Sequence, residues 1–81
     1  MADVRVRYFA AAADAAGRTD ETVDVFGPTV GDLRDLLVAR YGEPMERVLR
    51  TGSILVDGVV SRDRDRALGA SADVLPRFSG G

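Results

Sequence analysis

Residues 29–41 carry the clearest secondary-structure signal in this chain, a helical pattern with strand patterns before and after it. Apolar residues recur there every three or four positions, so they line one face of a helix. These residues are Val30, Leu33, Leu36, Leu37 and Tyr41. A helix with one apolar face has to bury that face against another layer, and the flanking strands supply a sheet. We therefore interpret the stripe as core packing and not as a cofactor site.

The predicted helix has recognisable signals at both ends. Thr29 is suited to cap the N-terminus, and Asp32 places a carboxylate in the first turn, where the helix dipole favours negative charge. Gly42 and Pro44 are typical of residues that end a helix. We expect residues 45–50 to form an irregular segment or a short 3₁₀ turn.

Two strand patterns precede the helix. Residues 4–9 and residues 22–26 each alternate apolar and polar side chains, as half-buried strands do. The side chains expected to face the core are Val4, Val6, Tyr8, Val23 and Val25. Between the strands, the alanine-rich residues 10–16 favour a short helix that ends at Gly17. We expect the two strands to pair as an antiparallel hairpin.

A second hairpin is predicted after the helix. Residues 53–56 and residues 59–60 are apolar strand candidates, and the Asp57-Gly58 dipeptide between them favours a two-residue type I′ turn. The charged residues 61–66 follow as a connection. Their alternating aspartates and arginines are more typical of a solvated loop than of a metal site.

Residues 72–78 predict the last strand, but Pro76 lacks the N–H group that a strand ladder needs. Pairing should therefore fade at Pro76, and the tail should leave the sheet. The order of elements predicts one α+β domain over residues 1–81, with a mixed sheet and one main helix packed on one face. We expect the first and last strands to lie side by side in parallel, joined by a right-handed crossover.

The residue types that this chain lacks restrict its chemistry. It contains no cysteine, histidine or lysine, which excludes a thiolate metal site, a cysteine nucleophile, a histidine base and a lysine Schiff base. The 11 basic and 13 acidic residues give a net charge of −2. The arginines alternate with acids along the sequence, so we expect no nucleic-acid binding. No apolar run approaches the ~20 residues of a membrane span and no leader precedes the domain, so we expect a cytoplasmic protein that starts at Met1.

The sequence ends in Ser79-Gly80-Gly81, directly after the last strand. Glycines have no Cβ atom, so such a tail can enter a slot too narrow for other residues and present the Gly81 carboxylate as its one reactive group. A frayed end rich in small residues is the alternative. The tail pattern alone leaves both interpretations open.

Taken in order, these segments resemble the MoaD/ThiS family of sulfur carriers, which have the ubiquitin-like β-grasp fold. The resemblance covers almost the whole chain. It rests on Tyr8-Phe9-Ala10, Ala15-Ala16-Gly17, Thr29-Val30-Gly31-Asp32-Leu33, Val56-Asp57-Gly58 and Leu75-Pro76-Arg77-Phe78-Ser79-Gly80-Gly81. The tail is most similar to that of the molybdopterin synthase small subunit, although Arg77 stands where that family has a second proline.

The resemblance implies a carrier that has no catalytic residues, bound cofactor or metal of its own. A ubiquitin-activating-enzyme-like adenylyltransferase would use ATP to adenylate the Gly81 carboxylate. A persulfide donor protein would then convert Gly81 into a thiocarboxylate. Residues Ser79, Gly80 and Gly81 would thread into the active site of the molybdopterin synthase large subunit, where the sulfur enters molybdenum cofactor biosynthesis.

The residues before the glycines are the predicted partner interface: Leu75, Pro76, Arg77 and Phe78. For Leu75 a place in the sheet core is the stronger interpretation, whereas Phe78, beyond Pro76, favours a partner contact. Arg77 suits either an acid on a partner or a solvated edge of the sheet.

Three alternatives stay open on the sequence. The tail suits a ubiquitin-like modifier that forms isopeptide bonds with lysines of target proteins. It suits equally a sulfur carrier for thiamin, cysteine or a secondary metabolite. In the third alternative the chain is a plain β-grasp binding module, and its terminal glycines are incidental.

Overall fold

The computed structural model describes residues 2–77, so Met1, Phe78, Ser79, Gly80 and Gly81 lie outside the described part. Strands and helices follow one another as β1 (Ala2–Tyr8), α1 (Ala11–Ala16), β2 (Asp20–Val25), α2 (Val30–Tyr41), α3 (Glu43–Thr51), β3 (Ser53–Val56), β4 (Val59–Ser61) and β5 (Ser71–Leu75). The expected strands and the expected long helix are all present, with shifts of a few residues at their ends.

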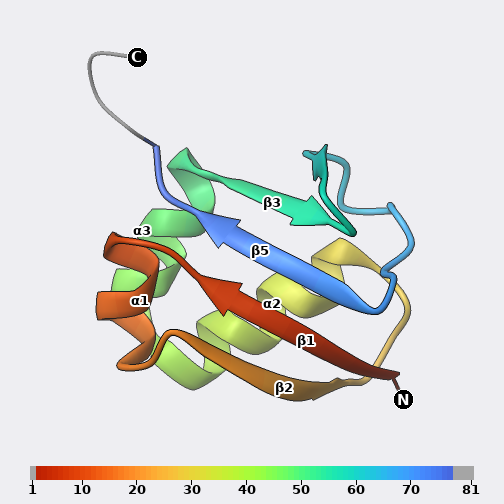
Figure 1. Cartoon of the computed structure of the whole chain (residues 1–81), viewed down its shortest axis with the longest axis horizontal. Helices are drawn as coiled ribbons and strands as arrows, with labels where there is room; N and C mark the ends of the chain where they lie inside the picture. Colours follow the sequence, from red (N-terminus) through yellow and green to blue (C-terminus); the bar gives the residue numbers. More distant parts are fainter. Residues whose placement is uncertain (1, 78–81) are drawn as a thin grey trace.

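The five strands form one mixed sheet in the order β2-β1-β5-β3-β4. β1 and β5 run parallel at its centre, and every other pair is antiparallel. The three helices cover one face of this sheet, and the other face is open (Figure 1). The α+β class, the hairpin of the first two strands and the parallel first and last strands are thus confirmed.

The buried side chains lie between the sheet and the helices. All five side chains that alternation assigned to the core of the first two strands are buried: Val4, Val6, Tyr8, Val23 and Val25. On α2, Val30, Leu33 and Leu37 are buried, whereas Leu36 and Tyr41 lie half-buried at the margin. The apolar stripe therefore packs as predicted, with its flank left partly open.

The N-terminus of α2 is held in place by its cap and by a distant loop. Thr29 Oγ1 accepts a hydrogen bond from the Asp32 N–H (3.2 Å), and Asp32 Oδ2 accepts one from the Thr29 N–H (3.1 Å). The next two free N–H groups, of Val30 and Gly31, donate to carbonyl oxygens in the loop after β4, each at 2.9 Å. This loop therefore packs against the helix end and satisfies donors that a helix leaves unpaired.

The prediction for residues 45–50 was wrong, because Glu43–Thr51 form the nine-residue helix α3. Met45, Val48 and Leu49 are buried at spacings of three and four residues, the pattern of an amphipathic helix. Pro44 lies in the first turn, where no N–H bond is required, so it begins α3 as well as following α2. The helix layer is accordingly larger than one main helix.

The predicted type I′ turn between β3 and β4 is confirmed. Asp57 and Gly58 both have positive φ angles, 50° and 86°, as this turn requires. The Asp57 carboxylate also accepts hydrogen bonds from the N–H and hydroxyl of Ser71, at 3.1 and 3.2 Å. The turn therefore anchors the start of β5, the strand from which the tail emerges.

Candidate functional site

The last strand ends in the middle of the sheet, and this position defines the candidate site. β5 lies between β1 and β3, and its final pair joins Leu75 to Ser53. Pairing stops before Pro76, as predicted from the missing N–H group. Leu75 and Pro76 are half-buried and Arg77 is exposed. We call these three residues the tail root; Phe78, Ser79, Gly80 and Gly81 lie outside the described residues, so their predicted roles stay predictions.

Gly52 is a site residue that the sequence analysis missed. It joins α3 to β3 and lies against the tail root. A Cβ atom at this position would overlap the carbonyl oxygen of Leu75, and it would lie 2.8 Å from the carbonyl oxygen of Val48 and 3.0 Å from Cα of Pro76. Only glycine therefore lets the helix end, the strand start and the tail root approach this closely. The sequence signal was a single glycine between two elements, which is also common where nothing packs nearby.

The open face of the sheet has an ion pair at its centre, and apolar side chains lie beside it toward the tail root and the β4 edge. Arg7 binds both carboxylate oxygens of its cross-strand neighbour Asp73, at 2.8 and 2.9 Å. The Arg7 guanidinium lies 5.8 Å from the ring centroid of Phe9, which is 38% exposed. Leu55 is the neighbour of Asp73 on β3, and the exposed Val60 faces Leu55 from β4. A partner approaching the tail root over this face would meet an apolar surface of modest size.

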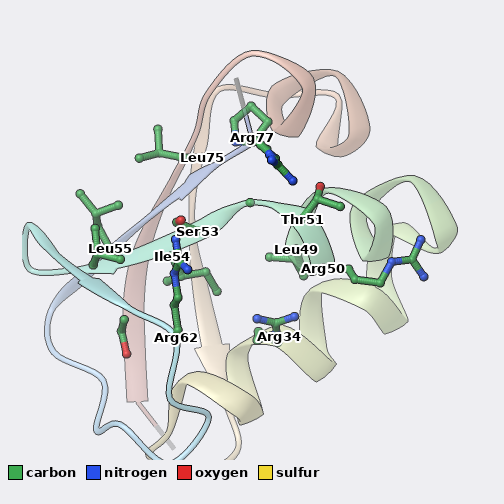
Figure 2. Close-up of a pocket in the computed structure, with 14 residues that line it drawn as sticks. Arg34, Leu49, Arg50, Thr51, Ser53, Ile54, Leu55, Arg62, Leu75 and Arg77 are labelled. Carbon is green, nitrogen blue, oxygen red and sulfur yellow. The ribbon is translucent and has the colours of Figure 1, made fainter. Parts of the chain in front are cut away.

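A groove opens beside the tail root, between the helix layer and the β3–β4 edge of the sheet (Figure 2). Its volume is about 770 Å³. Of the described residues, four arginines and no acidic residue line it: Arg34 of α2, Arg50 of α3, Arg62 after β4, and Arg77 of the tail root. We call it the arginine groove. These arginines are far apart in the sequence and form no basic stripe there; the fold brings them together.

The opposite edge of the sheet contains a buried polar network centred on Glu21 of β2. The Glu21 carboxylate accepts hydrogen bonds from the hydroxyls of Tyr8, at 2.5 Å, and Tyr41. The guanidinium groups of Arg18 and Arg40 reach the same carboxylate at 3.3 and 3.2 Å. The network ties β1, β2 and α2 together. Because every described buried side-chain nitrogen or oxygen has a partner, this cluster has no free group to offer a substrate.

Burial and the contacts within this network shift the pKa values of Glu21 and Tyr8 from their ordinary values. Burial by itself would raise the pKa of Glu21, but the Tyr41 and Tyr8 hydroxyls and the two arginines together lower it below its ordinary value. Burial, followed by the hydrogen bond to Glu21, raises the pKa of Tyr8 far above its ordinary value. The network is thus most stable with Glu21 ionised and the tyrosines neutral.

The structure gives the charged loop after β4 a structural role. Asp63 accepts a hydrogen bond from the Asp65 N–H at 2.9 Å, and Arg64 reaches Asp35 of α2 at 3.1 Å. Within residues 2–77, no three Asp or Glu side chains gather as a metal site would require. In the same residues, no helix has the length and apolarity to cross a bilayer.

No family model matches the sequence, and no curated protein matches it. Solved structures do match. SAMP1 from Haloferax volcanii is 28% identical over 99% of this chain and 100% of its own, with a TM-score of 0.74. The small archaeal modifier protein 1 from Methanosarcina acetivorans is 25% identical over 100% of this chain and 98% of its own, with a TM-score of 0.79.

A third match is a Pyrococcus furiosus protein provisionally named molybdopterin converting factor, subunit 1. It is 26% identical over 90% of this chain and 92% of its own, with a TM-score of 0.73. These neighbours are small carrier or modifier proteins of the MoaD/ThiS-like ubiquitin fold. The resemblance found in the sequence is confirmed, and the chain has the ubiquitin-like β-grasp fold.

Proposed function

We propose that this protein is a sulfur carrier whose Gly81 carboxylate is activated by a partner enzyme and converted into a thiocarboxylate. The observation that carries the proposal is the position of β5. This strand is held at the centre of the sheet by β1 and β3, and pairing ends at Leu75. The residues after Pro76 therefore continue from a root that is packed against Gly52. A rigid root lets a partner locate the reactive end by docking on the folded body.

A free carboxylate is a poor acyl donor, so the proposal begins with activation. A carboxylate oxygen of Gly81 attacks the α-phosphorus of ATP, and pyrophosphate leaves. The terminal sulfur of a partner persulfide then attacks the acyl carbon and releases AMP. A partner thiolate cleaves the resulting S–S bond, so Gly81 becomes a thiocarboxylate and the partner holds a disulfide. Because activation consumes ATP, we place the protein in the cytoplasm.

Among possible acceptors, we favour the molybdopterin synthase reaction, with this chain as the small subunit. The name of the Pyrococcus furiosus neighbour supports this choice, as does the Leu75-Pro76 step before the glycines. The thiocarboxylate sulfur would add to a pyranopterin precursor in the large subunit, and water would restore the Gly81 carboxylate. A dithiolene has two sulfurs, so two charged carriers would be consumed for each product.

The test is mass spectrometry of the full chain after incubation with the activating enzyme, ATP and a persulfide donor. Replacement of one carboxylate oxygen by sulfur adds about 16 Da. Deletion of Gly81 should abolish this species. A matched control with an Arg47→Gln substitution, at an exposed residue of α3, should retain it, because the carboxylate is unchanged. An unmodified wild-type mass in the presence of a demonstrably active enzyme would contradict the proposal.

A second function is favoured by the two neighbours that are modifier proteins. As a ubiquitin-like modifier, the activated Gly81 would be transferred to lysine amines of other proteins. Denaturing gels of cells expressing a tagged chain would then show a ladder of conjugates that disappears without Gly81. Conversion of a pyranopterin by the chain with a large subunit, and no ladder, would support the carrier role. Thiazole or cysteine formation instead would identify another acceptor.

A further inference from the structure

We infer that the arginine groove binds an acidic, partly apolar peptide segment of a partner protein, at a site separate from the reactive glycines. The groove lies between α2, α3 and the β3–β4 edge, and Arg77 forms its border with the tail root. This inference goes beyond the proposed sulfur chemistry, because it requires neither ATP nor Gly81.

Most of the positive charge of the groove is not neutralised within residues 2–77. Arg34 and Arg62 form no ion pair within residues 2–77. In Figure 2 the guanidinium groups of Arg34, Arg62 and Arg77 lie around the opening, whereas that of Arg50 points away. Arg50 approaches Glu46 at 3.9 Å. The protein carries a net charge of −2, so this concentration of cations is a local feature that attracts anions.

The chemistry of the lining favours carboxylates over other anions. Guanidinium groups present paired N–H donors in a planar fork that matches the two oxygens of a carboxylate. Phosphates of single-stranded RNA would also be attracted, but RNA-binding grooves use aromatic side chains to stack bases. Among residues 2–77, none of those that line this groove is aromatic.

Apolar side chains at the border between the groove and the open face of the sheet add a second requirement. Leu55 and Leu75 are half-buried and Val60 is 53% exposed, and all three line the groove from the open face of the sheet. An occupant that carries only charge would leave this surface in water. A segment in which acidic and aliphatic residues alternate would bury it and pair the arginines at the same time. This combination is the reason for choosing a peptide.

A peptide segment bound in the arginine groove would leave the end of the tail uncovered. Ser53 pairs with Leu75 at the end of β5, and Ser53 and Leu75 both line the groove. A segment bound there would therefore contact the folded body and the tail root. A partner could keep hold of the protein through the groove while Gly81 reacts elsewhere.

The test is fluorescence anisotropy of the full-length protein with a fluorescein-labelled peptide of alternating Glu and Leu residues. We expect saturable binding that weakens with salt, and none to the same peptide with Gln in place of Glu. Arg62→Gln and Arg34→Gln should each weaken binding about tenfold, the loss expected for one charge-assisted hydrogen bond. Arg47→Gln, on the exposed side of α3 and paired with Glu43, is the matched control and should bind like wild type.

Arg34 is half-buried, so its substitution could unfold the protein, and the melting temperature of each variant is measured together with its peptide affinity. Arg62 is exposed, so Arg62→Gln tests the inference even if Arg34→Gln unfolds. Amide chemical shifts should move at Ser53, Ser61 and Arg62 when the peptide is added. Absence of saturation up to about 1 mM peptide would overturn the inference. So would equal losses in Arg47→Gln and Arg62→Gln, or tighter binding of a poly-uridine oligonucleotide than of the peptide. None of these outcomes bears on thiocarboxylate formation.

Discussion

The two edges of the sheet differ in whether their charged side chains are paired. At the β2 edge, one carboxylate is 8% exposed and collects two tyrosine hydroxyls and two guanidinium groups. At the β4 edge, four arginines and no acid line a groove, as far as the described part of the chain extends. The first arrangement leaves nothing for a partner to bind. The second leaves Arg34, Arg62 and Arg77 without an ion-pair partner in residues 2–77.

The difference teaches where stability and recognition reside in this small fold. Glu21 bridges β2 to β1 through Tyr8 and to α2 through Tyr41, so the network closes the helix layer over its edge of the sheet. Buried polar groups are worth most when all are satisfied, and costly when one partner is lost. Exposed unpaired arginines contribute little to folding, so they can be used for binding. The following predictions, from the largest effect to the smallest, test this division.

Glu21→Ala should destabilise the protein by about 3 kcal/mol, because two tyrosine hydroxyls lose their acceptor and two arginines lose their counter-charge. Urea unfolding monitored by circular dichroism measures the change. Glu43→Ala is the matched control, since Glu43 also pairs with an arginine but is 78% exposed, and it should change stability by less than about 0.5 kcal/mol. Equal losses in the two variants would break the comparison between paired and open edges.

Gly52→Ala should cost about 2 kcal/mol, because the new Cβ atom meets backbone atoms that have to move apart. Its φ of −96° is accessible to alanine, so the cost comes from packing and not from the backbone conformation. Amide chemical shifts of Leu75 and Arg77 should move as the tail root is displaced. Gly31→Ala meets only the Arg64 side chain and should cost less; a larger loss there would show that the tail root adapts easily.

Acid should remove the contribution of the Glu21 network. The folded pKa of Glu21 lies below its unfolded value of 4.5, so the ionised carboxylate stabilises the fold fully above pH 4.5. That contribution is lost as the pH falls through the lower folded pKa. The difference in unfolding free energy between wild type and Glu21→Gln should therefore shrink from pH 7 to pH 3. A difference that stays constant would mean that the negative charge of Glu21 contributes nothing.

Arg62→Gln should leave the free energy of unfolding within about 0.5 kcal/mol of wild type, while reducing binding of the acidic peptide. Arg40→Gln is its counterpart at the other edge and should be measurably less stable, because Arg40 contacts Glu21. The urea unfolding curves of the two variants are directly comparable, since each substitution removes one guanidinium charge. Destabilisation by Arg62→Gln as large as by Arg40→Gln would contradict the assignment of the β4 edge to recognition.

Patterns that depend on near neighbours were predictable from the sequence. Strand alternation identified the buried residues of β1 and β2, and the Thr29 and Asp32 pair identified the start of α2. Asp57-Gly58 specified its turn because few residues tolerate two positive φ angles in succession. The helix α3 was missed because Pro44 both follows α2 and begins α3, and a proline alone does not distinguish these roles.

The candidate site divides in the same way. The sequence indicated the tail root, and the end of pairing at Pro76 follows from the chemistry of proline. It placed Leu75 preferentially in the core, whereas the structure has it half-buried on the open face of the sheet, at the border of the groove. The role of Gly52 depends on the tertiary structure, because only the fold places the end of β5 against the α3–β3 junction.

By itself, then, the sequence determined the elements, the core faces, the ubiquitin-like resemblance and the glycine-ended tail, because each depends on residues a few positions apart. The tertiary structure alone decided that Arg34, Arg50, Arg62 and Arg77 share one groove and that Glu21 collects partners from three elements. Such groups come from distant parts of the chain. Their charges act through space, and only the packing of helices on the sheet sets the distances between them.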